Sequence, residues 1–169
     1  ATSAYVDFST KDFIESNSIK TEISQFNTQR LSGMLKLFNK TSERNRQQFY
    51  VASEYSSTDG YFESPQNFHR FNLMGKYNAW FGNQSQLTIT ASTFDSKWYA
   101  SGQIPERAVQ AGIITRFGAI DNTEGGNTSR TNASIRFNKQ WKSNWKTTNQ
   151  VYFSRYKFNL YSNFTFFLE

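Results

Sequence analysis

The sequence contains no cysteine and a single histidine, His69, among its 169 residues. The absence of cysteine excludes a disulfide framework and a thiolate metal site, and one imidazole cannot build a zinc site from several histidines. Nucleotide-binding loops, zinc-ligand spacings and a G-x-S-x-G elbow are also missing. We therefore expect no enzyme activity, no catalytic residue, no cofactor and no bound metal.

Long runs of one charge sign are absent as well. The net charge is +6 and the isoelectric point is near 9.6, but no run of Lys and Arg exceeds two residues. A nucleic-acid-binding stripe is therefore not indicated, and we expect no nucleic-acid partner. The basic balance is explained either by a solvated surface or by attraction to lipid headgroups or an anionic ligand.

Apolar runs are far shorter than the roughly 20 residues of a membrane helix. Their absence does not exclude a membrane strand, which needs only roughly 10 residues and shows apolar side chains at every second position. Residues 1–4 carry neither the basic region nor the apolar region of a signal peptide. We expect such an opening in a mature or internal segment.

Aromatic residues are abundant on a polar background. Phe, Tyr and Trp make up 18% of the chain, while the hydrophobic total is only 37% and the mean hydropathy is −0.70. This balance is unusual for a soluble core of aliphatic side chains. It is typical of a wall with one apolar band between two wet ends.

Alternation with period two predicts β-strands along most of the chain. In residues 70–81, Phe71, Leu73 and Tyr77 alternate with polar residues such as Arg70 and Lys76. Similar patterns occur in residues 18–27, 31–39, 47–57, 85–97, 130–141 and 145 to about 160. The sequence thus predicts an all-β antiparallel meander of roughly seven strands, with Lys36, Arg70, Lys76 and Arg136 on its polar side.

The predicted connections alternate between short and long. Tight turns are expected at 82–84 and 142–144, whereas polar connections at 58–69 and 101–129 are long. Residues 105–112 read as one short loop helix, with a proline at its start and a glycine at its end. Trp80, Phe81, Trp141 and Trp145 flank the tight turns, where indole rings favour headgroup depth. Short turns at one end and long extracellular loops at the other indicate part of a transmembrane β-barrel.

Two stretches resemble the TonB-dependent outer-membrane transporters, in particular Bacteroidota members. Residues 5–11 (YVDFSTK) are similar to the last strand of the family's plug domain, although the family usually has Gly before that strand and Asn at the position of Asp7. The order of the predicted strands that follow, including the segments at residues 59–61 and 70–73, is similar to that of the first strands of the family's barrel. The short loop sequences at residues 101–105, 116–118 and 124–126 also resemble those of Bacteroidota members.

The resemblance implies a barrel of the 22-stranded type closed by an N-terminal plug. Residues 1–15 would be the end of the plug and its linker, and residues 16–169 the N-terminal part of the barrel. The chain would be a fragment, and because seven strands leave two unpaired edges, we expect the 169 residues not to form a stable unit alone.

The function implied is uptake of a scarce large ligand across the outer membrane of a Gram-negative bacterium, driven by the inner-membrane proton-motive force. The ligand could be a siderophore, oligosaccharide, peptide, cobalamin or metal chelate. Implied partners are outer-membrane lipid, the rest of the barrel and plug, and the TonB complex acting through the missing N-terminal part. A surface lipoprotein is an optional further partner.

Aromatic and arginine side chains in the long connections are the candidate ligand-facing residues, because aromatic faces beside Arg stack on ligands and pair with anionic groups. They are Tyr61, Phe62, His69, Trp98, Tyr99, Arg107 and Arg116. Packing of the loops over the plug explains the same residues without a ligand. We expect deletion of residues 101–129 to weaken ligand binding while leaving barrel assembly intact.

Two other functions remain open. A passive outer-membrane barrel, such as a porin or adhesin, shares the strands and aromatic girdles but has no plug. A soluble carbohydrate-binding module uses aromatic side chains for sugar, but it requires a complete closed or sandwiched fold within the chain.

Overall fold

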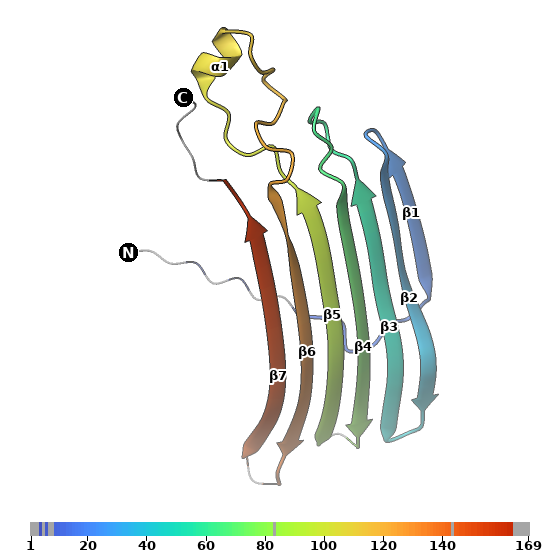
Figure 1. Cartoon of the computed structure of the whole chain (residues 1–169). Coiled ribbons are helices and arrows are strands. Elements are labelled where there is room, and N and C mark those ends of the chain that lie inside the picture. The colour runs from blue at the N-terminus through green and yellow to red at the C-terminus, as the bar shows by residue number, and fades with distance from the viewer. Residues whose placement is uncertain (1–3, 5, 7–8, 83, 143, 164–169) are drawn as a thin grey trace.

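The computed structural model describes residues 4, 6, 9–82, 84–142 and 144–163. They form one seven-stranded antiparallel sheet in which each strand pairs with the next along the chain (Figure 1). The strands are β1 (Ser18–Ser24), β2 (Thr28–Thr41), β3 (Asn45–Thr58), β4 (Phe68–Phe81), β5 (Ser85–Tyr99), β6 (Gly125–Gln140) and β7 (Lys146–Tyr161). The all-β antiparallel meander is therefore confirmed.

The predicted loop helix is also present. It is α1 (Glu106–Gln110), which follows Pro105 and ends before Gly112, a residue with a positive φ of 70°. Proline suits the first turn because it lacks the amide hydrogen that a helix start leaves unbonded. The plug strand predicted within residues 5–11 involves Tyr5, Asp7 and Phe8, which lie outside the described residues.

Two strand boundaries differ from the prediction because ladder pairing extends into residues that look like loop. His69 was expected in a long loop, but it lies in β4, where it pairs with Ser57 and Lys97. β6 begins at Gly125, which pairs with Tyr99, rather than at residue 130. Turn-forming residues are poor strand formers, yet here their backbone continues the pairing of neighbouring strands.

The pleat separates the side chains into two faces. On the face that we call the apolar face, most of the large hydrophobic side chains are exposed, and Phe49, Tyr77, Ile89, Ile135 and Val151 follow one another across five strands. The opposite face, here called the polar face, carries an ion-pair network in which Glu54 accepts from Arg30 at 2.5 Å and from Arg70 at 2.6 Å.

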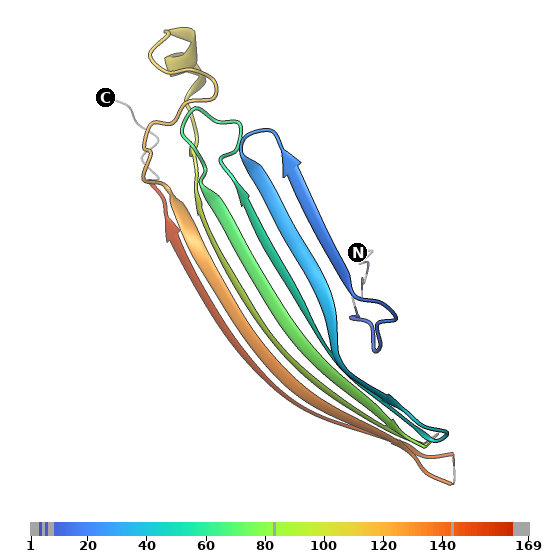
Figure 2. The same ribbon diagram turned by 90° about the vertical axis from the view of Figure 1, so that its right-hand side faces the viewer.

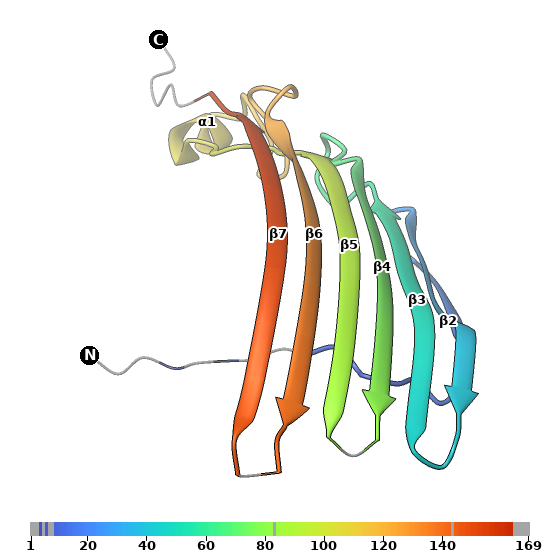
Figure 3. The same ribbon diagram turned by 90° about the horizontal axis from the view of Figure 1, so that it is seen from below.

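Residues 10–17, which we call the strap, cross the polar face before β1 begins. The sheet is bent along its strands, and the strap lies on the inner side of the bend (Figure 2). Seen from below, it runs across several strands rather than along one of them (Figure 3). The buried hydrophobic side chains among the described residues are only Ile14, Tyr50, Ala79 and Ala108, so the sheet is a single curved layer without a hydrophobic core.

The two ends of the sheet differ, as the sequence predicts. One end has tight turns, and the other carries the long loops and α1 (Figure 1). At the turn end, Phe81, Trp141 and Trp145 are exposed, and the Trp141 indole lies beneath the Lys139 ammonium group, 4.0 Å from ring centre to nitrogen. No helix of the described part is long and apolar enough to cross a membrane.

Candidate functional site

The loops at the long-loop end are joined to one another by backbone hydrogen bonds. The Glu63 amide in the β3–β4 loop donates to the Phe117 carbonyl in the β5–β6 loop at 2.9 Å. At the base of the same loops, the Tyr99 amide donates to the Gln66 carbonyl at 2.7 Å. The Asp59 amide also reaches the Phe26 carbonyl of the β1–β2 turn at 2.9 Å. These loops therefore form one connected surface.

Four aromatic rings from three connections make a cluster on this surface. Tyr61 stacks on Phe62 with a centroid separation of 4.3 Å, and Phe117 meets Tyr61 edge-on at 5.8 Å. Phe26 approaches Tyr61 at 6.4 Å from the β1–β2 turn, where its backbone has a positive φ of 59°. That conformation is unusual for a bulky residue, and it places the ring against the β3–β4 loop.

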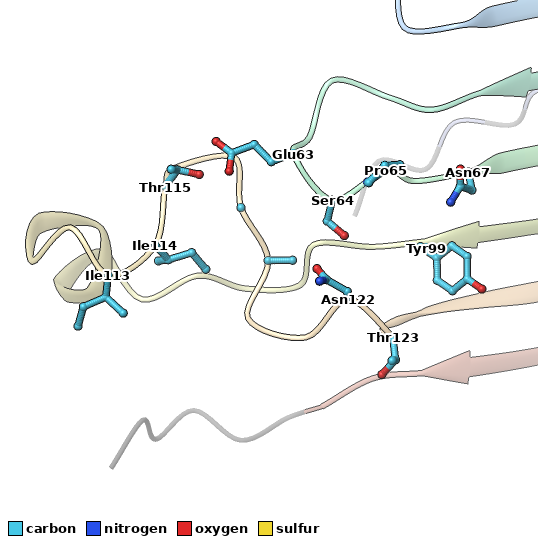
Figure 4. A pocket seen from close by; sticks show the side chains of 12 residues that line it. Glu63, Ser64, Pro65, Asn67, Tyr99, Ile113, Ile114, Thr115, Asn122 and Thr123 are labelled. Carbon is cyan, nitrogen blue, oxygen red and sulfur yellow. The ribbon is translucent and has the colours of Figure 1, made fainter.

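A hollow of about 730 Å³ lies beside this cluster, between the β3–β4 loop and the β5–β6 loop (Figure 4). Its wall combines the Tyr99 ring and the side chains of Ile113 and Ile114 with the polar groups of Glu63 and Asn122. Mixed linings of this kind and volume are usual for small-molecule sites, since apolar surface supplies contact and a few polar groups set orientation. It is the candidate ligand site of the described chain.

The edge of the hollow includes a turn fixed by Asp121. Its carboxylate accepts hydrogen bonds from the Thr123 hydroxyl at 2.6 Å and from the Thr123 amide at 2.8 Å. These two bonds stabilise the charged form and lower the pKa of Asp121. The turn therefore keeps a negative charge next to Asn122.

The seven candidate residues do not converge on one place. Tyr61 and Phe62 belong to the aromatic cluster, and Tyr99 lines the hollow. Trp98, its neighbour, lies on the polar face of β5, where its ring packs against Phe158 of β7 at 6.2 Å. Successive strand residues face opposite sides, so the Trp98 and Tyr99 side chains point to different faces of the sheet.

His69, Arg107 and Arg116 are not among the residues that line the hollow. The His69 side chain is exposed on the β4 strand. Arg107 is exposed on α1, and Arg116 is exposed next to Phe117. Two groups that the sequence analysis did not select belong to this region, namely Phe26 in the cluster and Glu63 in the hollow. The concentration of aromatic residues in loops was the available signal for Phe26.

The predicted polar-side cations divide into two kinds. Lys76 forms an ion pair with Asp12 of the strap at 2.9 Å, whereas Arg70 pairs with Glu54 of the sheet itself. The Arg70 Nε atom is buried and has no acceptor among the described residues. Within that same part of the chain, no three His, Asp or Glu side chains gather into a group that could hold a metal ion.

Searches with protein-family models, curated protein sequences and solved structures return no match to this chain. Its function must therefore be inferred from its own geometry.

Proposed function

We propose that this chain is a wall segment of a transmembrane barrel of the 22-stranded type in a TonB-dependent outer-membrane transporter. In this proposal the long loops contribute to capture of a scarce large ligand, and the energy-coupling contact with TonB lies elsewhere in the polypeptide. The proposal extends to the outer membrane of a Gram-negative bacterium of the Bacteroidota type.

The observation that carries the proposal is the contrast between the two faces of the sheet. Apolar side chains such as Leu31, Leu73, Ile135 and Val151 are at least two-fifths exposed on one face. A continuous exposed apolar surface indicates contact with lipid or with another protein. The opposite face carries ion pairs and buried amides, which suits the interior of a wide barrel.

Strand length agrees with a wall that extends beyond the bilayer. At roughly 3.3 Å per residue, the 14 residues of β4 measure about 46 Å. A tilted membrane strand needs only about 9–11 residues. The apolar face also turns polar toward the loop end, with Asp95, Lys97 and Lys157 on β5 and β7, so we place this end outside the membrane.

The alternatives fit the observations less well. A soluble carbohydrate-binding module needs a closed or sandwiched fold, whereas the described residues form a single layer. A passive channel needs an open interior, whereas the strap crosses the polar face here. The strap is what favours a plugged transporter over a porin.

The barrel part of the proposal is tested by cysteine labelling, for which this chain supplies no background thiol. Leu73→Cys faces the apolar side and Asn72→Cys the polar side, one residue apart. In outer membranes containing the intact polypeptide, a hydrophilic maleimide should label Asn72→Cys but not Leu73→Cys, and both should react after denaturation. Equal labelling of the two positions in native membranes would refute a lipid-facing apolar surface.

The transporter part needs a separate measurement. The intact polypeptide, solubilised in mild detergent, should be retained by the immobilised periplasmic domain of TonB from the same cell. A porin of that outer membrane serves as the negative control. If the labelling follows the barrel pattern but TonB does not retain the polypeptide, the proposed transporter is refuted in favour of a passive barrel.

A further inference from the structure

The sheet holds the strap mainly through the strap's own backbone. The carbonyls of Thr10, Lys11, Asp12, Ile14 and Glu15 each accept a hydrogen bond from a side chain of the sheet, and the donors are Lys76, Tyr50, Asn78, Gln48 and Lys36 in that order. These donors come from β2, β3 and β4. Recognition of successive carbonyls fixes the path of a segment that has no strand partner of its own.

Lys76 is the most completely bonded of the donors. Its ammonium group is 2.9 Å from the Asp12 carboxylate, 3.0 Å from the Thr10 carbonyl and 3.1 Å from the Thr10 hydroxyl. An ammonium group has three hydrogen atoms to donate, so the strap satisfies all of them. The Lys76 side chain is only 6% exposed, and the strap supplies the acceptors that let this charge lie buried.

Two buried amides complete the contact. Gln48 accepts from the Ile14 amide at 2.6 Å and donates to the Ile14 carbonyl at 3.0 Å, as a neighbouring strand would. Asn78 donates to the Asp12 carbonyl and accepts from Gln86. Gln48 and Asn78 are 1% and 0% exposed, and Ile14 is 3% exposed beneath the strap.

We infer that residues 10–17 are a permanent clamp on this wall, and that any movement of the polypeptide preceding them stops before Thr10. Gln48 also donates to the Asn39 side chain at 3.2 Å, but the strap accepts from donors on three strands at once, so its release would break a set of bonds cooperatively rather than one at a time. The clamp therefore belongs mechanically to the sheet, although most of it precedes residue 16, where the family resemblance implies that the barrel begins. The existence of the clamp does not rest on the proposed function. Its role as the fixed end of a moving plug does rest on it.

The test measures how often the strap leaves the sheet in the intact polypeptide in its membrane. Ile14→Cys places a thiol under the strap, and Ser16→Cys, two residues on, places one on its exposed side. A small hydrophilic maleimide should label Ser16→Cys rapidly and Ile14→Cys at least about 100-fold more slowly, because labelling of a buried thiol requires opening. Comparable rates for both thiols would overturn the clamp.

A second substitution shows whether the bonds described here cause the protection. Gln48→Leu removes both contacts to Ile14 and should speed labelling of Ile14→Cys on the order of tenfold, since two hydrogen bonds are lost. Gln150→Leu makes the same change on the same face of β7 and should leave the rate unchanged. Tyr50→Phe, which removes the bond from the Tyr50 hydroxyl to the Lys11 carbonyl, is the milder variant if Gln48→Leu does not fold. Unchanged rates in both Gln48→Leu and Tyr50→Phe would overturn the clamp.

The moving-plug role is tested by repeating the labelling in cells with and without an uncoupler of the proton-motive force. Ile14→Cys should stay protected in both states, and faster labelling in energised cells would show that the strap detaches. Retention on TonB is read from the experiment described above. If TonB does not retain the polypeptide while Ile14→Cys stays protected, the transporter proposal is refuted and the clamp still stands.

Discussion

An arginine at the middle of the apolar face should destabilise this wall much more than an arginine on the polar face. Ile89 is the position of choice, because it lies between Tyr77 and Ile135 in the apolar row and is 38% exposed. If that face contacts lipid, Ile89→Arg places a charge near the bilayer midplane. The cost in a transmembrane barrel is about 2–4 kcal/mol at that depth, which lowers the folded-to-unfolded ratio roughly 30- to 900-fold.

The assay is urea unfolding of the intact polypeptide in lipid vesicles, followed by the shift of the folded band on a cold denaturing gel. Ser92→Arg is the control, since Ser92 faces Met74 and Asn132 on the polar side of the same strand, and we expect a change below about 1 kcal/mol, as for a solvated surface substitution. A loss for Ile89→Arg no larger than for Ser92→Arg would refute lipid contact on the apolar face.

Gly126→Ala should destabilise the fold by about 1–3 kcal/mol in urea unfolding, because an added Cβ would lie 2.6 Å from the Asn159 carbonyl oxygen; Gly33→Ala, whose Cβ would meet nothing closer than 3.4 Å, should be neutral, and equal effects would contradict the packing. Phe117→Ala should accelerate limited trypsin cleavage of the β5–β6 loop several-fold, since aromatic pairs contribute about 0.5–1.5 kcal/mol each; Ile113→Ala, in the same loop and 79% exposed, should not, and a faster digest of both would point to general loosening. The pKa of Asp121 is lowered, so the bonds of its turn persist through the ordinary aspartate range and are lost only as the pH falls through the lowered value; the protection of the Thr123 amide, meaning its exchange rate relative to the intrinsic rate at each pH, should therefore fall in acid, and Asp121→Ala should abolish this pH dependence.

The sequence was sufficient for the strands because alternation is a local property. The Arg70-to-Phe81 pattern coincides with most of β4, and the tight turns fall where Gly82 and Lys142 suggest. The start of β6 was missed because its first residues are glycines, which have little strand preference. Their pairing with β5 depends on the neighbouring strand rather than on their own side chains. For this reason the predicted deletion of residues 101–129 would remove the beginning of β6, and a deletion confined to residues 103–120 is the better test of the loop.

The site could be predicted only in part because it depends on contacts between distant segments. Tyr61 and Phe62 were identified from their loop, but their partners Phe26 and Phe117 lie far away in the chain. The strap is a stronger case. Lys76 was predicted to lie on the polar side of the sheet, but its partner Asp12, 64 residues earlier, could not be identified. No periodic pattern connects two such positions, so only the folded chain shows that they meet.

The short length of β1 makes one edge of the sheet stepped. β1 covers β2 from Thr28 to Met34. Beyond that point the strap contacts β2 at Lys36, whose amide donates to the Asn17 side chain and whose ammonium group donates to the Glu15 carbonyl, and then crosses the polar face. A further strand joining this edge would lie beside β1 along one half and meet β2 directly along the other. A slip by one residue would exchange the two faces of that strand, and a slip by several would drive it against the corner at Ser18. The step is thus a positional stop that selects one register for whatever strand completes this side of the sheet.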